Sequence, residues 1–242
     1  MIVSLAGKKI LVTGATGAIG QAVAERLREC GAWVAGSYLG SEETAREMEK
    51  KKISMTRADL SHREEARRLV RRVLEQAGHL DGLVYTAGNT RDRTFLKMTD
   101  EEWDDVLRLH LDGLMACCRE VLPAMRQRGG GKLVALGSIS GAIGRAGQAN
   151  YSAAKAAVVG FMKSLAREAG RFGVSANVIL PGFVDSRMTR SAPPEAWERA
   201  KADSAMGRIS DAQVAASFIA WMLSDFCQGV TGQVFNLDSR VY

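Results

Sequence analysis

The sequence predicts an α/β fold with a doubly wound parallel sheet in a single domain. Short apolar runs alternate with longer amphipathic segments, and this alternation is typical of βαβ units. The composition, 46% hydrophobic and 25% charged residues in a chain of 242, suits one α/β domain. No repeat, low-complexity linker or break in composition divides the chain. We therefore expect residues 1–242 to form one domain.

The predicted strands are the apolar runs, each ending where glycine or polar residues follow. They are Lys9–Thr13, Trp33–Ala35, Ile53–Arg57, Gly82–Thr86, Lys132–Ser138, Val174–Leu180 and Gln233–Leu237. Open parallel sheets bind ligands beyond the carboxyl ends of their strands, so the chemistry is expected in the loops that follow these runs.

The predicted helices lie between the strands. Gly31 ends the first helix, and Ser41, followed by acidic residues, starts the second. They are Gln21–Cys30, Ser41–Lys52, Glu64–Ala77, Glu101–Met125, Ser152–Ala169 and Asp211–Leu223. The polar segment Ser186–Asp203 is expected to be mobile and to form a substrate loop.

Charge and hydropathy exclude several classes of partner. The chain has 33 Lys and Arg against 27 Asp and Glu, a net charge of +6, which alone is compatible with nucleic acid, a membrane or an acidic protein. The most charged window, Arg63–Arg72, lacks interleaved aromatic residues, which favours a solvated helix face over a nucleic-acid site. The longest uncharged stretch, Ile10–Ala24, has 15 residues and is too short to span a membrane. We expect neither nucleic acid nor a membrane as partner.

The cysteines and histidines predict no metal site and no disulfide framework. The cysteines form no Cys-x-x-Cys pair, and the three histidines are scattered. We expect the cysteines to be small buried hydrophobic residues in a reducing, cytoplasmic compartment. They are Cys30, Cys117, Cys118 and Cys227. No signal peptide is visible in Met1–Leu5.

A glycine-rich loop, Thr13–Gly20, joins the first strand to the first helix. Such a loop lets backbone N–H groups face a pyrophosphate at a helix N-terminus, as in a Rossmann fold. A turn without a ligand is the alternative. NAD-binding folds usually carry an acid after the second strand. Here that region has Ser37 and no carboxylate before Glu42, which favours NADP(H).

Tyr151 and Lys155 stand four residues apart, on one face of a predicted helix. An ammonium near a phenol favours the phenolate and lowers its pKa, so that the tyrosine exchanges a proton with a carbonyl or alcohol oxygen. Ser138, at the end of the fifth strand, lies at the same edge and can hold the substrate oxygen. A surface pair is the default for Tyr-x-x-x-Lys alone, but the dinucleotide loop and the serine favour catalysis.

Together these motifs resemble the short-chain dehydrogenase/reductases from about Leu5 to Asp238. Within that family the chain looks most like the 3-ketoacyl-acyl-carrier-protein reductases. Further matching segments are Asp59-Leu60, Thr86-Ala87-Gly88, Met98–Trp103, Gly147–Tyr151, Pro181–Thr189 and Thr231–Gln233. The resemblance implies NADPH and hydride transfer to a 3-ketoacyl thioester on acyl carrier protein, in fatty-acid or polyketide-type biosynthesis.

By the same resemblance, Tyr151 is the acid, Lys155 is its pKa partner and holds the ribose, and Ser138 holds the carbonyl. The cofactor-binding residues implied are Gly14, Thr16, Gly17, Ile19, Gly20, Ser37, Asp59, Leu60, Ala87, Gly88, Tyr151, Lys155, Pro181, Gly182, Val184 and Ser186. Arg128 and Arg171, with Arg126 nearby, are implied to hold the acidic carrier beside the active-site mouth.

The chain departs from the family pattern at several positions. Ala18 stands where the family has the middle glycine of the loop. Gly17 stands where many NADPH-dependent members have a basic residue. Tyr85 and Thr86 replace the start of an Asn-Asn-Ala-Gly segment. His110 replaces an asparagine that holds a water of the proton relay, and histidine titrates near pH 6.5. The relay either survives with a new pH dependence or is impaired, and the intact catalytic residues favour an active enzyme.

Two other functions stay open: a dehydrogenase of a small alcohol, sugar or steroid, and a weakly active dinucleotide-binding subunit that pairs with a relative. The resemblance also implies a homo-oligomer, tetramer or dimer, built on helices Glu101–Met125 and Ser152–Ala169. The apolar residues of these helices equally allow a core-only interpretation. They are Val106, Leu107, Leu111, Leu114, Val158, Phe161 and Leu165.

Overall fold

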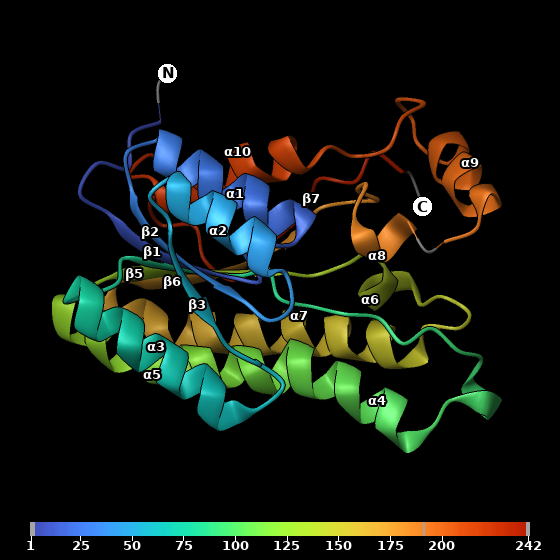
Figure 1. Cartoon of the computed structure of the whole chain (residues 1–242), viewed down its shortest axis with the longest axis horizontal. Coiled ribbons are helices and arrows are strands. Elements are labelled where there is room, and N and C mark those ends of the chain that lie inside the picture. The colour runs from blue at the N-terminus through green and yellow to red at the C-terminus, as the bar shows by residue number, and fades with distance from the viewer. Residues whose placement is uncertain (1–2, 191, 241–242) are drawn as a thin grey trace.

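A computed structural model describes residues 3–190 and 192–240, without the side chain of Arg187. Within these residues, seven strands form one parallel sheet in the order β3-β2-β1-β4-β5-β6-β7 (Figure 1). The strands are β1 (Lys9–Thr13), β2 (Trp33–Tyr38), β3 (Ser54–Arg57), β4 (Gly82–Tyr85), β5 (Gly131–Leu136), β6 (Val174–Leu180) and β7 (Val234–Asn236). The strand order reverses between β1 and β4, where doubly wound folds bind their ligands. The predicted fold class is confirmed.

Helices cover both faces of the sheet (Figure 1). One face carries α1 (Ala18–Glu29), α2 (Glu42–Lys50) and α10 (Ala212–Leu223), and the other α3 (Arg63–Ala77), α4 (Asp100–Leu107), α5 (Gly113–Arg128) and α7 (Ala149–Ala169). Each face has its own apolar core because strand side chains alternate in direction. Leu83 and Tyr85 therefore join the core under α3, α5 and α7, while Val84 joins the core under α1 and α10.

One helix predicted as continuous is interrupted in the structure. A π-helical turn, η2 (Arg108–Asp112), interrupts the predicted helix Glu101–Met125 and separates α4 from α5. The apolar pattern hides this break because a π-bulge widens only one turn and the helix direction continues. Other boundaries shift by a few residues; α1, for example, begins at Ala18 rather than Gln21.

Short elements gather beyond the carboxyl ends of the strands. Figure 1 shows α6 (Ser140–Ile143), α8 (Arg187–Arg190) and α9 (Pro194–Ala202) at this end of the molecule. The predicted substrate loop Ser186–Asp203 therefore holds two helices, with Ser191 outside the described residues. In the described part of the chain, no helix is long and apolar enough to cross a membrane.

Candidate active site

The glycine loop between β1 and α1 has the geometry of an anion-binding turn. Gly14 adopts a left-handed φ of +62°, and a Cβ there would lie 2.8 Å from the Cα of Ala87. A Cβ on Gly20 would lie 2.3 Å from the carbonyl oxygen of Gly14. The first-turn amides of α1, from Ala18 onward, have no acceptor inside the helix and form the positive end of its dipole. The loop residues Thr16, Gly17 and Ile19 remain accessible. A dinucleotide pyrophosphate fits this cradle.

Residues at or after the ends of β2 and β3 lie at the same edge of the sheet as this loop. The Ser37 side chain is buried, and its hydroxyl accepts a hydrogen bond from the Gly14 amide at 3.3 Å. The Asp59 carboxylate accepts hydrogen bonds from the amide and hydroxyl of Ser61, at 2.9 and 2.7 Å. The Leu60 side chain is buried in the core, so its main chain is the part that remains to contact a ligand.

Arg57 is a cation at this edge that the sequence analysis missed. It is paired in register with Tyr38, at the end of the neighbouring strand. Its Nε donates to the Leu39 carbonyl oxygen at 3.0 Å and lies 3.9 Å from a carboxylate oxygen of Glu42. Only the register of β2 and β3 reveals this position, because Arg57 stands 19 residues after Tyr38 in the sequence.

The structure brings Ser138, Tyr151 and Lys155 together at the carboxyl end of β5. Ser138 follows the strand, and the first turns of α7 carry the other two residues. Ser138 lies close enough to Tyr151 for its side chain to lower the pKa of the phenol by hydrogen bonding. The Lys155 Nζ donates to the Leu136 carbonyl oxygen at 2.7 Å and lies 5.6 Å from the centroid of the Tyr151 ring.

The predicted lowering of the Tyr151 pKa is wrong, because burial dominates the net shift. Burial raises the pKa of Tyr151 to about 12, although the hydrogen bond with Ser138 lowers it in part. Burial also lowers the pKa of Lys155 to about 7. Both shifts have one cause: a site shielded from water disfavours phenolate and ammonium alike. Tyr151 is therefore a neutral phenol at pH 7, which is the form that donates a proton.

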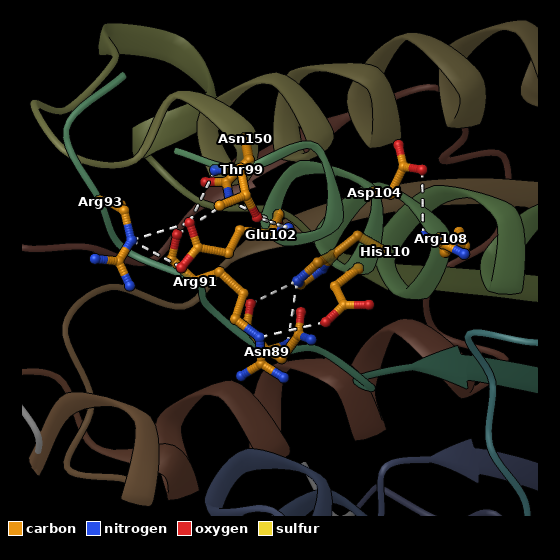
Figure 2. A network of polar contacts seen from close by, with 10 residues as sticks. Asn89, Arg91, Arg93, Thr99, Glu102, Asp104, Arg108, His110 and Asn150 are labelled. Atoms are coloured by element: carbon orange, nitrogen blue, oxygen red, sulfur yellow. Dashed lines mark hydrogen bonds and ion pairs between the residues drawn. The ribbon is translucent and has the colours of Figure 1, made fainter. Parts of the chain in front are cut away.

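His110 lies in the π-helical turn and packs against the catalytic tyrosine. Its Nε2 is 2.9 Å from the Asn89 carbonyl oxygen and 3.2 Å from the Asn89 amide nitrogen (Figure 2). Its ring meets the Tyr151 ring edge-on, with centroids 5.4 Å apart, and a Cβ on Gly88 would lie 2.5 Å from its Cε1. Burial and then the charge of Lys155 lower the pKa of His110 well below its usual value. The expected pH dependence near 6.5 is wrong, because the buried imidazole stays neutral.

Asn150, which the sequence analysis did not single out, anchors the start of α7. Its Nδ2 donates to the carbonyl oxygens of Arg91 and Glu102, at 3.1 and 3.0 Å (Figure 2). Its Oδ1 accepts from the Tyr151 amide at 2.8 Å. The side chain thus ties the loop after β4, and α4, to the helix that carries the catalytic tyrosine. Its carbonyl partners lie 59 and 48 residues earlier, so no local pattern reveals this role.

The loop after β6 leads from the sheet into α8. Gly182 has a φ of +84°, and a Cβ there would lie 2.1 Å from the Oγ of Ser210. Val184 is buried and forms an isolated bridge with Ser210. The Ser186 amide donates to the Thr189 hydroxyl at 2.9 Å. The predicted cofactor-binding residues Pro181, Gly182, Val184 and Ser186 therefore follow β6 at the same edge of the sheet as Ser138.

The arginines expected at the active-site mouth lie elsewhere on their own chain. Arg128 ends α5, and its Nη2 is 3.8 Å from an Asp81 carboxylate oxygen, before β4. Arg171 lies in the 3₁₀ turn η3 (Gly170–Phe172), just before β6, with its guanidinium 4.7 Å from the centroid of the Phe172 ring. Both are at the amino edge of the sheet, the opposite edge from Tyr151. In a βαβ unit the helix returns to this edge before the next strand begins.

A family model described as enoyl-(acyl carrier protein) reductase matches residues 14–239. The chain is 36% identical to the 3-oxoacyl-[acyl-carrier-protein] reductase of Staphylococcus aureus, covering 97% of this chain and 98% of that protein. It belongs to the short-chain dehydrogenase/reductase family. The reductases of the same name from Salmonella typhimurium and Escherichia coli are 36% and 35% identical, covering 99% and 98% of this chain and 99% and 98% of theirs. The crystal structure of gox2181 has a TM-score of 0.92 and 30% identity, covering 98% of this chain and 96% of that one. The predicted family resemblance is confirmed.

Proposed function

We propose that this chain is an NADPH-dependent 3-oxoacyl-acyl-carrier-protein reductase. It reduces a 3-ketoacyl thioester to the 3-hydroxyacyl form in fatty-acid biosynthesis, and the same chemistry serves polyketide-type synthesis. The observation that carries the proposal is the meeting of Ser138, Tyr151 and Lys155 beside a dinucleotide cradle. Relatives of 35–36% identity over nearly the full length, which carry that name, support the substrate class.

Each catalytic side chain has a role that its geometry supports. NADPH supplies the hydride that adds to the carbonyl carbon. Ser138 donates a hydrogen bond to the carbonyl oxygen, and the neutral Tyr151 hydroxyl gives that oxygen its proton. Lys155 uses the N–H donors that do not face Leu136 to hold the ribose hydroxyls, and its charge stabilises the phenolate left on Tyr151.

The cofactor residues divide among the parts of NADP(H). The loop Thr13–Gly20 would hold the pyrophosphate, Asp59 and the main chain of Leu60 would meet the adenine, Ala87 and Gly88 the ribose region, and Val184 and Ser186 the nicotinamide. Arg57 neutralises the 2′-phosphate: it lies beside the end of β2, and its terminal nitrogens make no hydrogen bond to any described residue.

His110 takes the place of the relay asparagine. Its Nδ1 is buried and has no hydrogen-bond partner among the described residues, and a neutral imidazole can both donate and accept. A buried polar atom of this kind is normally satisfied by ordered water. We infer that this neutral ring holds the relay water without a charge change near neutral pH.

We also infer a homo-oligomer, a dimer or tetramer, that acts on acyl carrier protein in the cytoplasm. A groove between α5 and α7 is lined by partly exposed Met115, Leu122, Phe161 and Phe172, which supports contact between subunits. The carrier role of Arg128 and Arg171 then requires that they face the active-site mouth of a neighbouring subunit. The cysteines of the described chain are unpaired, which suits a reducing compartment.

The test is NADPH oxidation, followed by absorbance, with an acetoacetyl thioester on N-acetylcysteamine and on acyl carrier protein. Turnover that is lost in Tyr151→Phe supports the proposal. Turnover of small ketones or alcohols but not of thioesters favours a dehydrogenase of small substrates. Tight NADPH binding without turnover favours the non-catalytic subunit, and recovery of turnover in His110→Asn identifies the histidine as its cause.

A further inference from the structure

A side chain from the sheet binds one main-chain carbonyl of the π-helical turn before α5. The Leu109 carbonyl oxygen accepts a hydrogen bond of 2.6 Å from the hydroxyl of Tyr85. Tyr85 is the last residue of β4, is 3% exposed, and points into the core under α3 and α5. A π-helical turn disrupts the regular α-helical bonding, so a donor from outside the helix stabilises the wide turn.

The neighbouring glycine makes room for this hydroxyl. A Cβ on Gly113 would lie 2.4 Å from the Tyr85 hydroxyl oxygen and 2.4 Å from the Leu60 carbonyl oxygen. Any side chain at this position would push the hydroxyl away from Leu109. The sequence of the turn is thus fitted to a tyrosine at the end of β4.

The peptide held by Tyr85 leads directly to His110. The ring of His110 is fixed on one side by the main chain of Asn89 and by the small residue Gly88. On the other side it meets the Tyr151 ring edge-on. Two of the departures from the family pattern, Tyr85 and His110, are therefore joined through a single peptide, that of Leu109.

We propose that the Tyr85 hydroxyl is a positioning group for the reduction, acting through the Leu109 carbonyl on His110 and through that ring on Tyr151. The proposal rests on the proposed ketoreductase function. Tyr85 touches no reacting atom; it fixes the turn from which the histidine projects. A tyrosine hydroxyl is suited to this task because it donates one directed hydrogen bond from a rigid ring.

The test is a cycle of Tyr85→Phe, His110→Asn and the double variant, assayed with NADPH and acetoacetyl thioester. Tyr85→Phe is expected to lower kcat by about tenfold with the KM for NADPH unchanged, since one hydrogen bond is lost without a change in shape. In the His110→Asn background the same change is expected to have little further effect. Gly113→Ala, which displaces the hydroxyl from the helix side, is expected to reproduce the loss.

Ser224→Ala is the matched control. Its buried hydroxyl donates to the Trp221 carbonyl oxygen at 2.7 Å, at the amino edge, so its loss lowers the Tm but leaves kcat unchanged once corrected for folded enzyme. An unchanged kcat in Tyr85→Phe, or an equal loss with and without His110, overturns the proposal.

A readout independent of turnover separates this inference from the proposed function. The imidazole ¹⁵N resonances of His110 and the amide hydrogen exchange of Arg108–Gly113 are expected to change in Tyr85→Phe and not in Ser224→Ala. If the native chain reduces no thioester, the proposed function fails while these signals still test the Tyr85 link. Unchanged signals in Tyr85→Phe overturn the link in either case.

Discussion

A half-buried lysine, Lys132, and a buried lysine, Lys155, lie at opposite edges of the sheet, and they differ in how completely their ammonium groups are satisfied. At the amino edge, Lys132 Nζ donates to the carbonyl oxygens of Met222, Ser224 and Cys227, at 2.8, 2.6 and 2.7 Å. At the carboxyl edge, Lys155 donates to Leu136 alone among the described residues. An ammonium has three N–H donors. All three N–H donors of Lys132 are used within its own chain, whereas Lys155 has N–H donors left for a ligand.

Three polar atoms near the active site are also unsatisfied. Asn89 Oδ1, His110 Nδ1 and Ser152 Oγ are buried without a hydrogen-bond partner among the described residues. Asn89 lies in the loop after β4, His110 in the π-helical turn and Ser152 at the start of α7, and these three segments frame the catalytic tyrosine. Native cores normally satisfy such atoms. The amino edge is not free of such atoms, because Arg26 Nε and Arg28 Nε in the last turn of α1 are also buried without a partner among the described residues. The contrast between the two edges therefore rests on the two lysines and on the unpartnered atoms around Tyr151.

The largest expected effect is that of Lys155→Met. Removing the group that stabilises the phenolate and holds the ribose is expected to lower kcat/KM by about 10²–10⁴-fold. The fold should survive, because a buried, poorly solvated ammonium is replaced by an apolar side chain of similar length. Steady-state assays with circular dichroism check both points. Retained activity in a folded Lys155→Met variant would show that the unused N–H donors of Lys155 have no catalytic role.

The same pair of proteins tests the titration of Lys155. Its folded pKa is about 7, below the usual value of 10.5, so between pH 7 and 9 the unfolded chain binds the extra proton. Stability of the native protein should therefore rise with pH in this window, by about 2 kcal/mol relative to Lys155→Met. The raised pKa of Tyr151 acts in the opposite sense above pH 10, outside the window. Denaturant unfolding at pH 7, 8 and 9 measures the difference, and parallel curves for the two proteins would contradict it.

Lys132→Met is expected to lower the stability of the protein and to leave its activity unchanged. Three carbonyl oxygens lose their donor, which is expected to lower the free energy of unfolding by about 2 kcal/mol while kcat is retained. Thermal unfolding and assays at saturating substrate measure the two quantities. A loss of kcat as large as that in Lys155→Met would show that the two edges are not functionally distinct.

Arg57 is a second cation at the carboxyl edge whose N–H donors are not all used within the described residues. Arg57→Gln is expected to raise the Kd of NADPH by about tenfold and to leave that of NADH unchanged, because only NADPH carries the 2′-phosphate. Glu42→Gln, which removes the neighbouring carboxylate, is the control and should not weaken NADPH binding. Cofactor fluorescence titration measures all four affinities. Equal losses for NADPH and NADH would assign Arg57 to structure alone.

The sequence predicts the parts of the site that depend on local spacing and on the ends of strands. Tyr151 and Lys155 share a helix face, and the glycine loop directly follows β1, so both follow from the pattern of residues. The roles of Lys132 and Asn150 do not, because their partners lie 48 to 95 residues away in the chain. The neutral state of His110 likewise depends on burial, which no motif encodes. The π-helical turn is hidden because the apolar pattern continues across it.

The smallest expected effect tests the arginines of the amino edge. On their own chain Arg128 and Arg171 lie across the sheet from Tyr151, so a carrier role needs a neighbouring subunit. The double variant Arg128→Glu with Arg171→Glu is expected to raise the KM for the carrier-bound substrate by about fivefold and to leave the small thioester unaffected. The carrier effect should weaken in high salt, because exposed charges are screened. Equal effects on both substrates would exclude the carrier role, and light scattering under assay conditions establishes whether a second subunit is present to receive these arginines.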